Sequence, residues 1–404
     1  MSAATAPQRG PLTGVTVIDL GQIYNGPYCT FMMAMAGAEV IKVEPIGGEN
    51  LRRRAQVGGA ALPFAMLNSN KRFVTLNLKH ARGREMFLQM VAKADVLVEN
   101  FSVHAMERLG LDYPVLSALN PGLVYASSTG YGRSGPMTAY PAMDIAVQAM
   151  SGVMSINGFE DRPPVKVGPA MADFAAGTHL YAAITTALFE RQRTGFGQHV
   201  EVSMLESVYA SLASNLGLYY AKQGQVSART GNKHGGMAES PYNVYPTADG
   251  GYIAIVASSD QQWRRLLSAI GRAELIDDGR YSTLKARVAY MDEVDEIVEA
   301  FTRAHSRDRA FAILMEASVT CAPVRDIGEV VNDPHLLERG ALEWTEHPLY
   351  GRIPLQRSPL RFGNAPEQAI EPSGEAGRDN AVVYQQWLGL SEQDLAQLKN
   401  DEVI

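Results

Sequence analysis

Cysteine is nearly absent from this sequence: only Cys29 and Cys321 occur among 404 residues. Two cysteines exclude a disulfide framework and a metal site of four thiolates, and they fit a reducing cytoplasm. The eight histidines show no zinc-binding helical spacing such as HExxH, so we expect no structural metal. Cys29 lies in an apolar stretch beside Met32 and Met33, which is more typical of a core residue than of a nucleophile.

The chain also lacks an excess of basic residues and any long hydrophobic run. Its formal net charge of −7 argues against nucleic acid as a bulk partner, although helix N-termini and single Arg or Lys residues can bind an anion locally. No apolar segment approaches the length that spans a bilayer. The N-terminal stretch MSAATAPQRGPLTG is polar, has no signal-peptide core and reads as a loose tail. We therefore expect a cytoplasmic protein without a nucleic acid or membrane partner.

Familiar catalytic and dinucleotide-binding signatures are missing as well. The sequence contains no GxSxG elbow and no CxxC motif. GYGRSGP does spell the dinucleotide fingerprint, with Gly130, Gly132 and Gly135 after a predicted strand. That fingerprint requires a helix that opens within it, but Pro136 and Pro141 follow at once. NAD binding is therefore disfavoured, and the segment is interpreted as a flexible loop that could serve as an active-site lid.

The first half of the chain alternates short runs rich in Val and Ile with helical segments. Such strands, which lack clean polar alternation, predict βαβ units and an α/β sheet covered by helices on both faces. A long helix is predicted from just after Asp173 to about Arg193. The predicted strands cover residues 14–20, 38–44, 72–78, 95–101, 122–132 and 199–204.

The pattern changes after residue 224. Residues 224–251 are rich in Gly, Ser, Asn and Pro, which predicts a loop or linker. A strand at residues 252–258 and several amphipathic helices follow, and we interpret residues 242–323 as the core of a smaller domain. The tail from Arg325 has few strong elements and many prolines, so it either returns to the first domain or wraps a partner.

Asp173 stands out because it is one carboxylate in the small, apolar stretch KVGPAMADFAAGTHL. Burial of a charge without a partner is costly. An Asp before a helix is a favoured N-cap, and physical chemistry alone favours this interpretation. The alternative is a carboxylate nucleophile or base, next to glycines that let a substrate approach. Both interpretations are compatible, and we expect the helix N-terminus to keep the carboxylate ionised.

The most basic part of this acidic chain is PIGGENLRRR. It places Gly47 and Gly48 before Arg52, Arg53 and Arg54, close in sequence to Lys42 and to NKR at residues 70–72. Charge runs usually form a solvated face. Arginine also binds phosphates and carboxylates through paired hydrogen bonds, and the residues alone leave both interpretations open.

Several stretches together resemble the family III CoA-transferases of the CaiB/BaiF type, which include formyl-CoA transferase and the carnitine CoA-transferase. The resemblance covers nearly the whole chain and implies a Rossmann-like large domain, a smaller α+β domain and a homodimer of interlocked rings. It implies a large domain over residues 1–225, a linker and small domain over 226–324, and a return of 325–404 to the large domain. The stretches are PLTGVTVIDL, GPYCTFMMAMAGAEVIKVEP, NSNKRFVTLNLK, ADVLVENF, MERLGLDY, NPGLVYASSTGYGRSGP, ADFAAGTHLYAAITTALFERQRTGFGQHVEVSM and DIGEVVNDPHL.

The resemblance implies roles for individual residues. By motif match, Asp173 is the catalytic nucleophile, and Gly235 and Gly236 lie where relatives carry a glycine-rich substrate loop. Tyr24 and Thr129 stand where formyl-CoA transferase has Gln and Lys, which argues against formyl or oxalyl specificity. The positions that match CoA contacts are Ile23, Tyr24, Asn25, Leu76, Asn100, Phe101, Arg108, Tyr131 and Met204.

The implied reaction moves CoA from an acyl-CoA donor such as succinyl-CoA to a carboxylic acid, through an aspartyl mixed anhydride and an aspartyl-CoA thioester. CoA and acyl-CoA are then substrates, and no cofactor is bound permanently. Arg52, Arg53, Arg54 and Arg72 could bind a second carboxylate, so we expect a short dicarboxylate such as succinate, itaconate or mesaconate.

Two other functions, a racemase and a non-catalytic binding protein, compete with the transferase interpretation. The related 2-methylacyl-CoA racemases use a His directly before an Asp-Ile pair, and Met143 occupies that place in PAMDIAVQAMSG. Methionine cannot exchange a proton in the relevant range, so a racemase is disfavoured. A non-catalytic acyl-CoA-binding protein is disfavoured because Asp173 and the motifs around it are intact.

Overall fold

The computed structural model describes residues 10–54, 61–225 and 229–404. Residues 1–9 of the expected loose tail, and the start of the predicted linker at 226–228, lie outside the described residues. Two compact units form the chain, and each is discontinuous in sequence. The first combines Met1–Val147, Pro169–Val208 and Val331–Ile404, and the second combines Gln148–Gly168 and Tyr209–Val330. Residues 148–168 and 209–225, which the resemblance assigns to the large domain, therefore belong to the second unit.

A six-stranded, all-parallel sheet forms the centre of the first unit, in the order β3-β2-β1-β4-β5-β6. This is the doubly wound Rossmann order, in which the direction of winding reverses between β1 and β4. All six predicted strands are present, although shorter than expected. They are β1 (Thr16–Asp19), β2 (Glu39–Glu44), β3 (Arg72–Thr75), β4 (Val96–Glu99), β5 (Val124–Thr129) and β6 (His199–Ser203).

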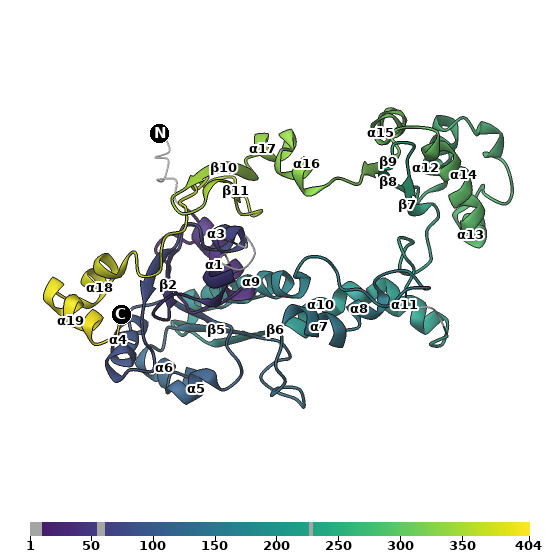
Figure 1. The fold of residues 1–404 in the computed structure, drawn as a ribbon. Helices are drawn as coiled ribbons and strands as arrows, with labels where there is room; N and C mark the ends of the chain where they lie inside the picture. The colour runs from purple at the N-terminus through teal and green to yellow at the C-terminus, as the bar shows by residue number, and fades with distance from the viewer. Residues whose placement is uncertain (1–9, 55–60, 226–228) are drawn as a thin grey trace, which may run out of the picture. The chain divides into compact units, whose positions relative to one another are not determined.

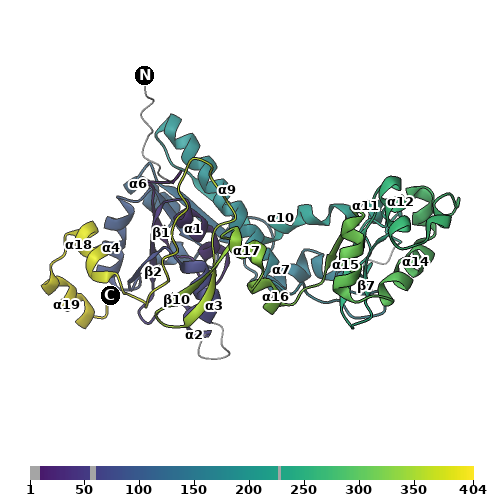
Figure 2. The same cartoon turned by 90° about the horizontal axis from the view of Figure 1, so that it is seen from above.

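Helices cover both faces of this sheet (Figure 1). Successive strand residues point to opposite faces, and both faces are buried, which explains the uninterrupted apolar runs. Val17 of β1 packs with α1 (Asn25–Met35) and α9 (Met171–Thr194), whereas its neighbour Ile18 packs with α4, α6 and α18. Figure 2 shows these two layers on opposite sides of the strands. The remaining helices before α7 (Asp144–Met150) are α2 (Asn50–Arg54), α3 (Ala61–Asn68), α4 (Ala81–Val91), α5 (Ala105–Leu109) and α6 (Tyr113–Leu119).

The C-terminal segment is richer in regular structure than expected. Val331–Ile404 belongs to the first unit, where the Tyr384 hydroxyl donates a hydrogen bond of 2.7 Å to the carbonyl of Thr75. The segment includes a β-hairpin that weak alternation and Pro354 hid from sequence analysis. Its elements are α17 (Pro334–Glu338), β10 (Leu342–His347), β11 (Gly351–Gln356), α18 (Asn380–Leu388) and α19 (Glu392–Asn400), and α16 (Ile327–Val331) precedes them at the end of the second unit.

The second unit contains an antiparallel sheet of β7 (Tyr242–Pro246), β8 (Tyr252–Val256) and β9 (Thr320–Pro323). Amphipathic helices bury Trp263, Val294 and Leu314 against it. These helices are α12 (Asp260–Ala269), α13 (Leu284–Ala289), α14 (Met291–Arg303) and α15 (Arg307–Glu316). The elements not yet named are α8 (Val153–Ile156), α10 (Met204–Tyr209), α11 (Ala213–Ala221), and the 3-10 turns η1 (Ala210–Leu212) and η2 (Ala273–Leu275).

Two features are absent from residues 10–54, 61–225 and 229–404, the described ranges. None of their helices is long and apolar enough to cross a membrane. They also bring no three His, Cys, Asp or Glu side chains into an arrangement that could hold a metal ion.

Candidate active site

A cavity of about 590 Å³ opens at the carboxyl edge of the six-stranded sheet. Its walls are the segments that follow β1, β4, β5 and β6, so it lies at the switch point of the Rossmann order, where such folds bind ligands. Its volume suits a small-molecule site. Of the residues predicted from sequence, it brings together Asp173, Ile23, Asn25, Asn100, Phe101, Arg108, Tyr131 and Met204.

A second cavity, of about 390 Å³, shares Gln22 and Phe101 with the first. It follows the ends of β1, β2 and β3 and includes Leu76 and Lys79. Leu76, another predicted CoA contact, therefore lines this neighbouring cavity and not the one that contains Asp173. The two cavities together extend along the carboxyl edge from β3 to β6.

Asp173 does not cap its helix. The α9 helix begins at Met171, its N-cap is Ala170 without a side-chain hydrogen bond, and Asp173 is in the first turn. The cap comes from another helix, because the Asp144 Oδ1 atom of α7 accepts a hydrogen bond of 2.9 Å from the Ala172 N–H. The predicted N-cap role of Asp173 is therefore wrong, and its carboxylate does not cap the start of the helix.

A glycine lets α1 approach α9 closely beside Asp173. A Cβ atom on Gly177 would lie 2.7 Å from the carbonyl oxygen of Asn25. Residues 173 and 177 share one helix face, so the close approach brings the first turn of α1 to the acid. The Asn25 backbone also favours the ionised form of the Asp173 carboxylate, which lowers its pKa. The small residues around Asp173 thus serve helix packing as well as access.

Burial determines the electrostatics of Asp173, of whose surface only 9% is exposed. Desolvation, followed by repulsion from Asp144, raises the pKa of Asp173 to about 7, although Arg54 and the Asn25 backbone favour the ionised form. We had expected the helix N-terminus to keep this carboxylate fully ionised, and that expectation is wrong. Desolvation and a like charge outweigh the first-turn position. The result is a more basic carboxylate than an exposed one, with both protonation states populated near neutral pH.

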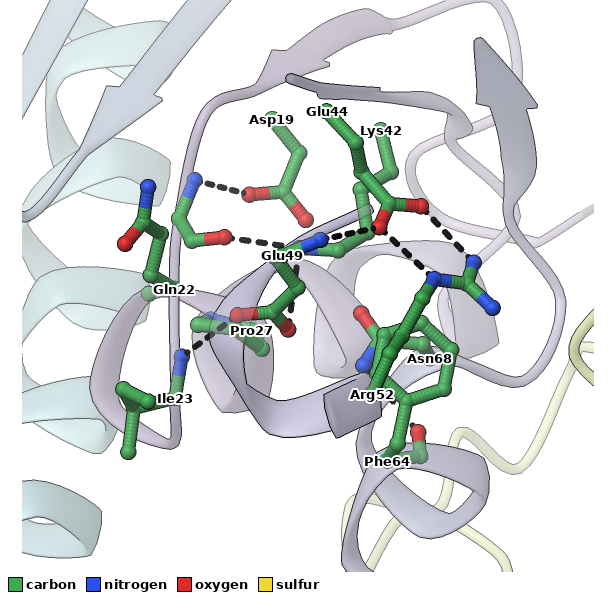
Figure 3. A network of polar contacts seen from close by, with 12 residues as sticks. Asp19, Gln22, Ile23, Pro27, Lys42, Glu44, Glu49, Arg52, Phe64 and Asn68 are labelled. Atoms are coloured by element: carbon green, nitrogen blue, oxygen red, sulfur yellow. Dashed lines mark hydrogen bonds and ion pairs between the residues drawn. The ribbon is translucent and has the colours of Figure 1, made fainter. Parts of the chain in front are cut away.

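The basic segment of the sequence folds into a buried network below the turn after β1 (Figure 3). Arg52 binds Glu44 twice, at 2.7 Å from each of two nitrogens, and lies 3.9 Å from the ring centre of Phe64. Lys42 and Lys71 are also buried. These three cations face Asp19, Glu44 and Glu49, so the network balances three charges of each sign. The part of the segment around Arg52 is therefore neither a solvated face nor an open anion site, whereas Arg53 and Arg54 are exposed.

Arg53, Arg54 and Arg72 do not line the cavity, unlike Arg108. Arg72 pairs with Glu39 at 3.4 Å on the exposed edge of the sheet, and one nitrogen of Arg53 reaches the carbonyl of Gly48 at 3.4 Å. Arg54 is exposed at the end of α2, and its charge acts on Asp173. Arg54, and not the predicted Arg52 or Arg72, is therefore the arginine that the fold brings within electrostatic range of the acid.

The remaining predicted residues fall in three places. Tyr24 stacks on Phe174 with ring centres 5.9 Å apart, next to the cavity but not in its wall. Met143, which replaces the racemase histidine, does line the cavity. Gly235 and Gly236 belong to the second unit, and their role as a substrate loop stays a prediction.

Sequence reasoning missed three acids. Asp144 sits next to Met143 in the PAMDIAVQ stretch, but nothing in the stretch indicates that it caps α9. Glu49 lies within the basic segment and was passed over in favour of its arginines. Glu99 ends β4 and accepts a hydrogen bond of 2.8 Å from the Phe101 N–H, and burial raises its pKa to about 7. An acid directly after an apolar strand is the one signal that could have drawn attention to Glu99.

Known proteins resemble this chain over nearly its whole length. The family model described as CoA-transferase family III matches residues 12–380. The succinyl-CoA–D-citramalate CoA-transferase of Chloroflexus aurantiacus is 35% identical, with both chains covered in full. The succinate–glutarate CoA-transferase of Agrobacterium fabrum is 36% identical over 93% of this chain and 95% of that protein. A CaiB/BaiF family protein from Brucella suis has a TM-score of 0.82 at 33% identity, covering 94% of this chain and 100% of that one.

Proposed function

The chain belongs to CoA-transferase family III and is a CoA-transferase, and we propose that it moves CoA from succinyl-CoA to a short dicarboxylic acid through covalent intermediates on Asp173. One observation carries the proposal. A buried carboxylate with a pKa raised to about 7 lies in the wall of a cavity at the switch point of a Rossmann sheet. Carboxylates are weak nucleophiles, and desolvation makes this one more basic without removing its ionised form.

The first half of the reaction forms the enzyme thioester. The ionised Asp173 attacks the carbonyl carbon of the donor thioester, and the C–S bond breaks to release CoA thiolate and leave an aspartyl mixed anhydride. The thiolate then attacks the aspartyl carbonyl. This step expels the donor acid as its carboxylate and leaves Asp173 as a CoA thioester.

The second half repeats these steps with the acceptor. The acceptor carboxylate attacks the aspartyl thioester, which gives a new mixed anhydride and free thiolate. Attack of the thiolate on the acceptor carbonyl forms the new acyl-CoA and regenerates the Asp173 carboxylate. No net proton is taken up, so the protein must mainly orient the groups and stabilise negative oxygen.

The two adjoining cavities suit a long, thin substrate. We propose that the thioester end lies near Asp173 and Asn25, and that the nucleotide end extends past Phe101 toward Leu76 and Lys79. Support comes from the shared Gln22 and Phe101 and from the presence of seven of the nine predicted CoA contacts in the first cavity. Arg108, which is exposed at one wall, is available to a phosphate group.

Arg54 supports a dicarboxylate as the acid substrate. Its charge acts on Asp173, whereas Arg52 and Arg72 are engaged by Glu44 and Glu39. The names of the relatives point the same way, because D-citramalate, succinate and glutarate are dicarboxylates. We propose that Arg54 binds the carboxylate that does not react, while the other carboxylate meets Asp173.

We further propose a cytoplasmic homodimer. The α11 helix buries none of its residues within its own chain, and Tyr219 and Tyr220 are 51% and 75% exposed. An apolar helix surface of this kind usually meets a protein partner. We propose a second copy of the chain as that partner. Equilibrium sedimentation that found only monomer at micromolar concentration would contradict this proposal.

Hydroxylamine provides the direct test of the covalent mechanism. With succinyl-CoA present, it should convert Asp173 to a hydroxamate that peptide mass spectrometry locates, and Asp173→Asn protein should give none. Adduct formation on another residue, or normal CoA transfer by the Asp173→Asn protein, would contradict the proposal. A panel of mono- and dicarboxylic acids then tests the substrate class. Rapid α-deuteration of a 2-methylacyl-CoA in D2O without any acceptor would instead favour the racemase, which Met143 in the cavity wall disfavours.

A further inference from the structure

The turn after β1 contains a strained residue in the wall of the cavity. Ile23 has a φ of 64°, in the left-handed region that β-branched residues rarely adopt. Strained backbone of this kind persists where the surroundings enforce it, and it clusters at functional sites. The turn leads directly into Asn25, the first residue of α1, which packs closely against Gly177 one turn from Asp173 and whose backbone favours the ionised acid.

The buried network holds Gly21 and Ile23 of this turn (Figure 3), and Asn100 holds Gln22 between them. The Gly21 carbonyl accepts a hydrogen bond of 2.6 Å from Lys42, and the Ile23 N–H donates one of 3.1 Å to the Glu49 Oε2 atom. Between them, Asn100 accepts from the Gln22 N–H at 2.7 Å and donates to the Gln22 carbonyl at 2.9 Å. Glu49 is therefore the group that bonds the strained residue itself.

Other residues of the buried network hold Glu49 in place. Its own N–H donates a hydrogen bond of 2.9 Å to Glu44, which two nitrogens of Arg52 also bind. Its second oxygen lies 3.7 Å from Lys42 and makes no hydrogen bond among the described residues. Burial of such a group adds little net stability, because desolvation offsets most of the attraction between the charges. The arrangement is better explained by the precision that it gives to the turn.

We propose that Glu49 is a positioning residue for CoA transfer, which holds the strained Ile23 turn so that the Asn25 backbone continues to favour the ionised Asp173 carboxylate. This proposal rests on the proposed function of Asp173. Glu49 touches no substrate and moves no proton. Its effect passes through the backbone of residues 23–25 to the acid. The other charged groups that act on Asp173 are Asp144 from α7 and Arg54 from α2. Lys42 and Lys71 act on Glu49, and Glu44, which Arg52 binds, accepts a hydrogen bond from the Glu49 N–H.

A double-mutant cycle between positions 23 and 49 tests this role. Glu49→Ala should slow the single-turnover formation of the aspartyl adduct from succinyl-CoA by at least tenfold, with a smaller change in KM for the donor. It should also move the acid limb of that rate to higher pH, because the Asn25 backbone no longer favours ionised Asp173. Ile23→Gly accepts a positive φ at no steric cost, so it should restore most of the lost rate in the Glu49→Ala background.

Matched variants distinguish positioning from a general loss of stability. Ile23→Val also shortens the side chain but keeps the β-branch, so it should not rescue Glu49→Ala. If Glu49→Ala does not fold, the cycle is run with Glu49→Gln, whose amide oxygen can still accept from Ile23 and which should lose about threefold to tenfold. Effects of the two sites that simply multiply, or an unchanged acid limb, would overturn the proposal. A wild-type protein that forms no adduct would overturn the proposed function instead.

Discussion

Two groups of buried charges lie at the carboxyl edge of the same sheet, and they differ in how they are balanced. The network around Lys71 and Asp19 pairs every charge with an opposite one, and the Lys71 ammonium makes four hydrogen bonds. Asp173 is buried beside a like charge, Asp144, and its opposing cation Arg54 is exposed. The first arrangement fixes structure. The second leaves a carboxylate whose charge is poorly stabilised, and a reaction can use that property.

The same contrast appears in the titration of the two groups. Burial alone would raise the pKa of Asp19, but Lys71 and Lys42 outweigh it and hold that pKa below its ordinary value. Burial of Asp173 meets no such compensation, and its pKa rises to about 7. The pKa values of these two buried aspartates thus differ because of their charged partners and not because of their burial. The variants below either break this distinction or make it sharper.

The largest expected effect comes from breaking the balanced network. Lys71→Met leaves Asp19 buried without its main cation and should lower the free energy of unfolding by about 3–5 kcal/mol. Its neighbour in sequence provides the control. Arg72 makes exposed contacts with Glu39 and Gln386, so Arg72→Gln should cost no more than about 1 kcal/mol. Urea unfolding monitored by circular dichroism measures both. Equal losses would mean that the network is no more important than a surface pair.

Removal of the Asp173 charge should have the opposite sign. Because its pKa rises from 3.8 to about 7 on folding, the ionised form disfavours the native state. The penalty is absent below pH 3.8, grows between there and pH 7, and is complete above it. Asp173→Asn should therefore abolish transfer and yet stabilise the fold by up to about 4 kcal/mol at pH 8. Unfolding curves at pH 5 and pH 8 test this, and a gain that did not grow with pH would contradict the unbalanced site.

The sequence predicts the strands and helices of the fold better than it predicts which charged side chains meet. All six sheet strands follow from their β-branched runs, because both faces of a covered parallel sheet are apolar. The β10–β11 hairpin was missed because its strands mix charged residues with a proline. The motif match predicts a role for Asp173, but the acid that helps to raise its pKa, Asp144, comes from another element. Lys42 and Lys71 were read as potential surface charges because Asp19 and Glu49, their partners, are distant in sequence or hidden in a basic run.

A milder change sharpens the comparison at Asp173 alone. Asp144→Asn keeps an oxygen that can accept from the Ala172 N–H but removes the like charge. The pKa of Asp173 should fall, so the acid limb of kcat/KM should move to lower pH while the maximal rate changes little. Glu99→Gln is the control, because burial also raises the pKa of Glu99 to about 7. If Glu99→Gln moved the limb and Asp144→Asn did not, the limb would belong to Glu99.

The smallest expected effect concerns the exposed cation of the unbalanced site. Arg54→Gln removes a charge that acts on Asp173 without disturbing the buried network. The KM for a dicarboxylate acceptor should rise by about threefold to tenfold, as loss of one solvent-exposed charged contact allows, and the KM for a monocarboxylate should stay unchanged. Arg53→Gln is the matched control. It removes the same charge at the neighbouring residue, whose side chain contacts the carbonyl oxygen of Gly48. Steady-state assays with succinyl-CoA and an acid panel separate the two variants. If both arginine variants raised the KM for both classes of acid alike, Arg54 would be acting through general charge and would not recognise a second carboxylate.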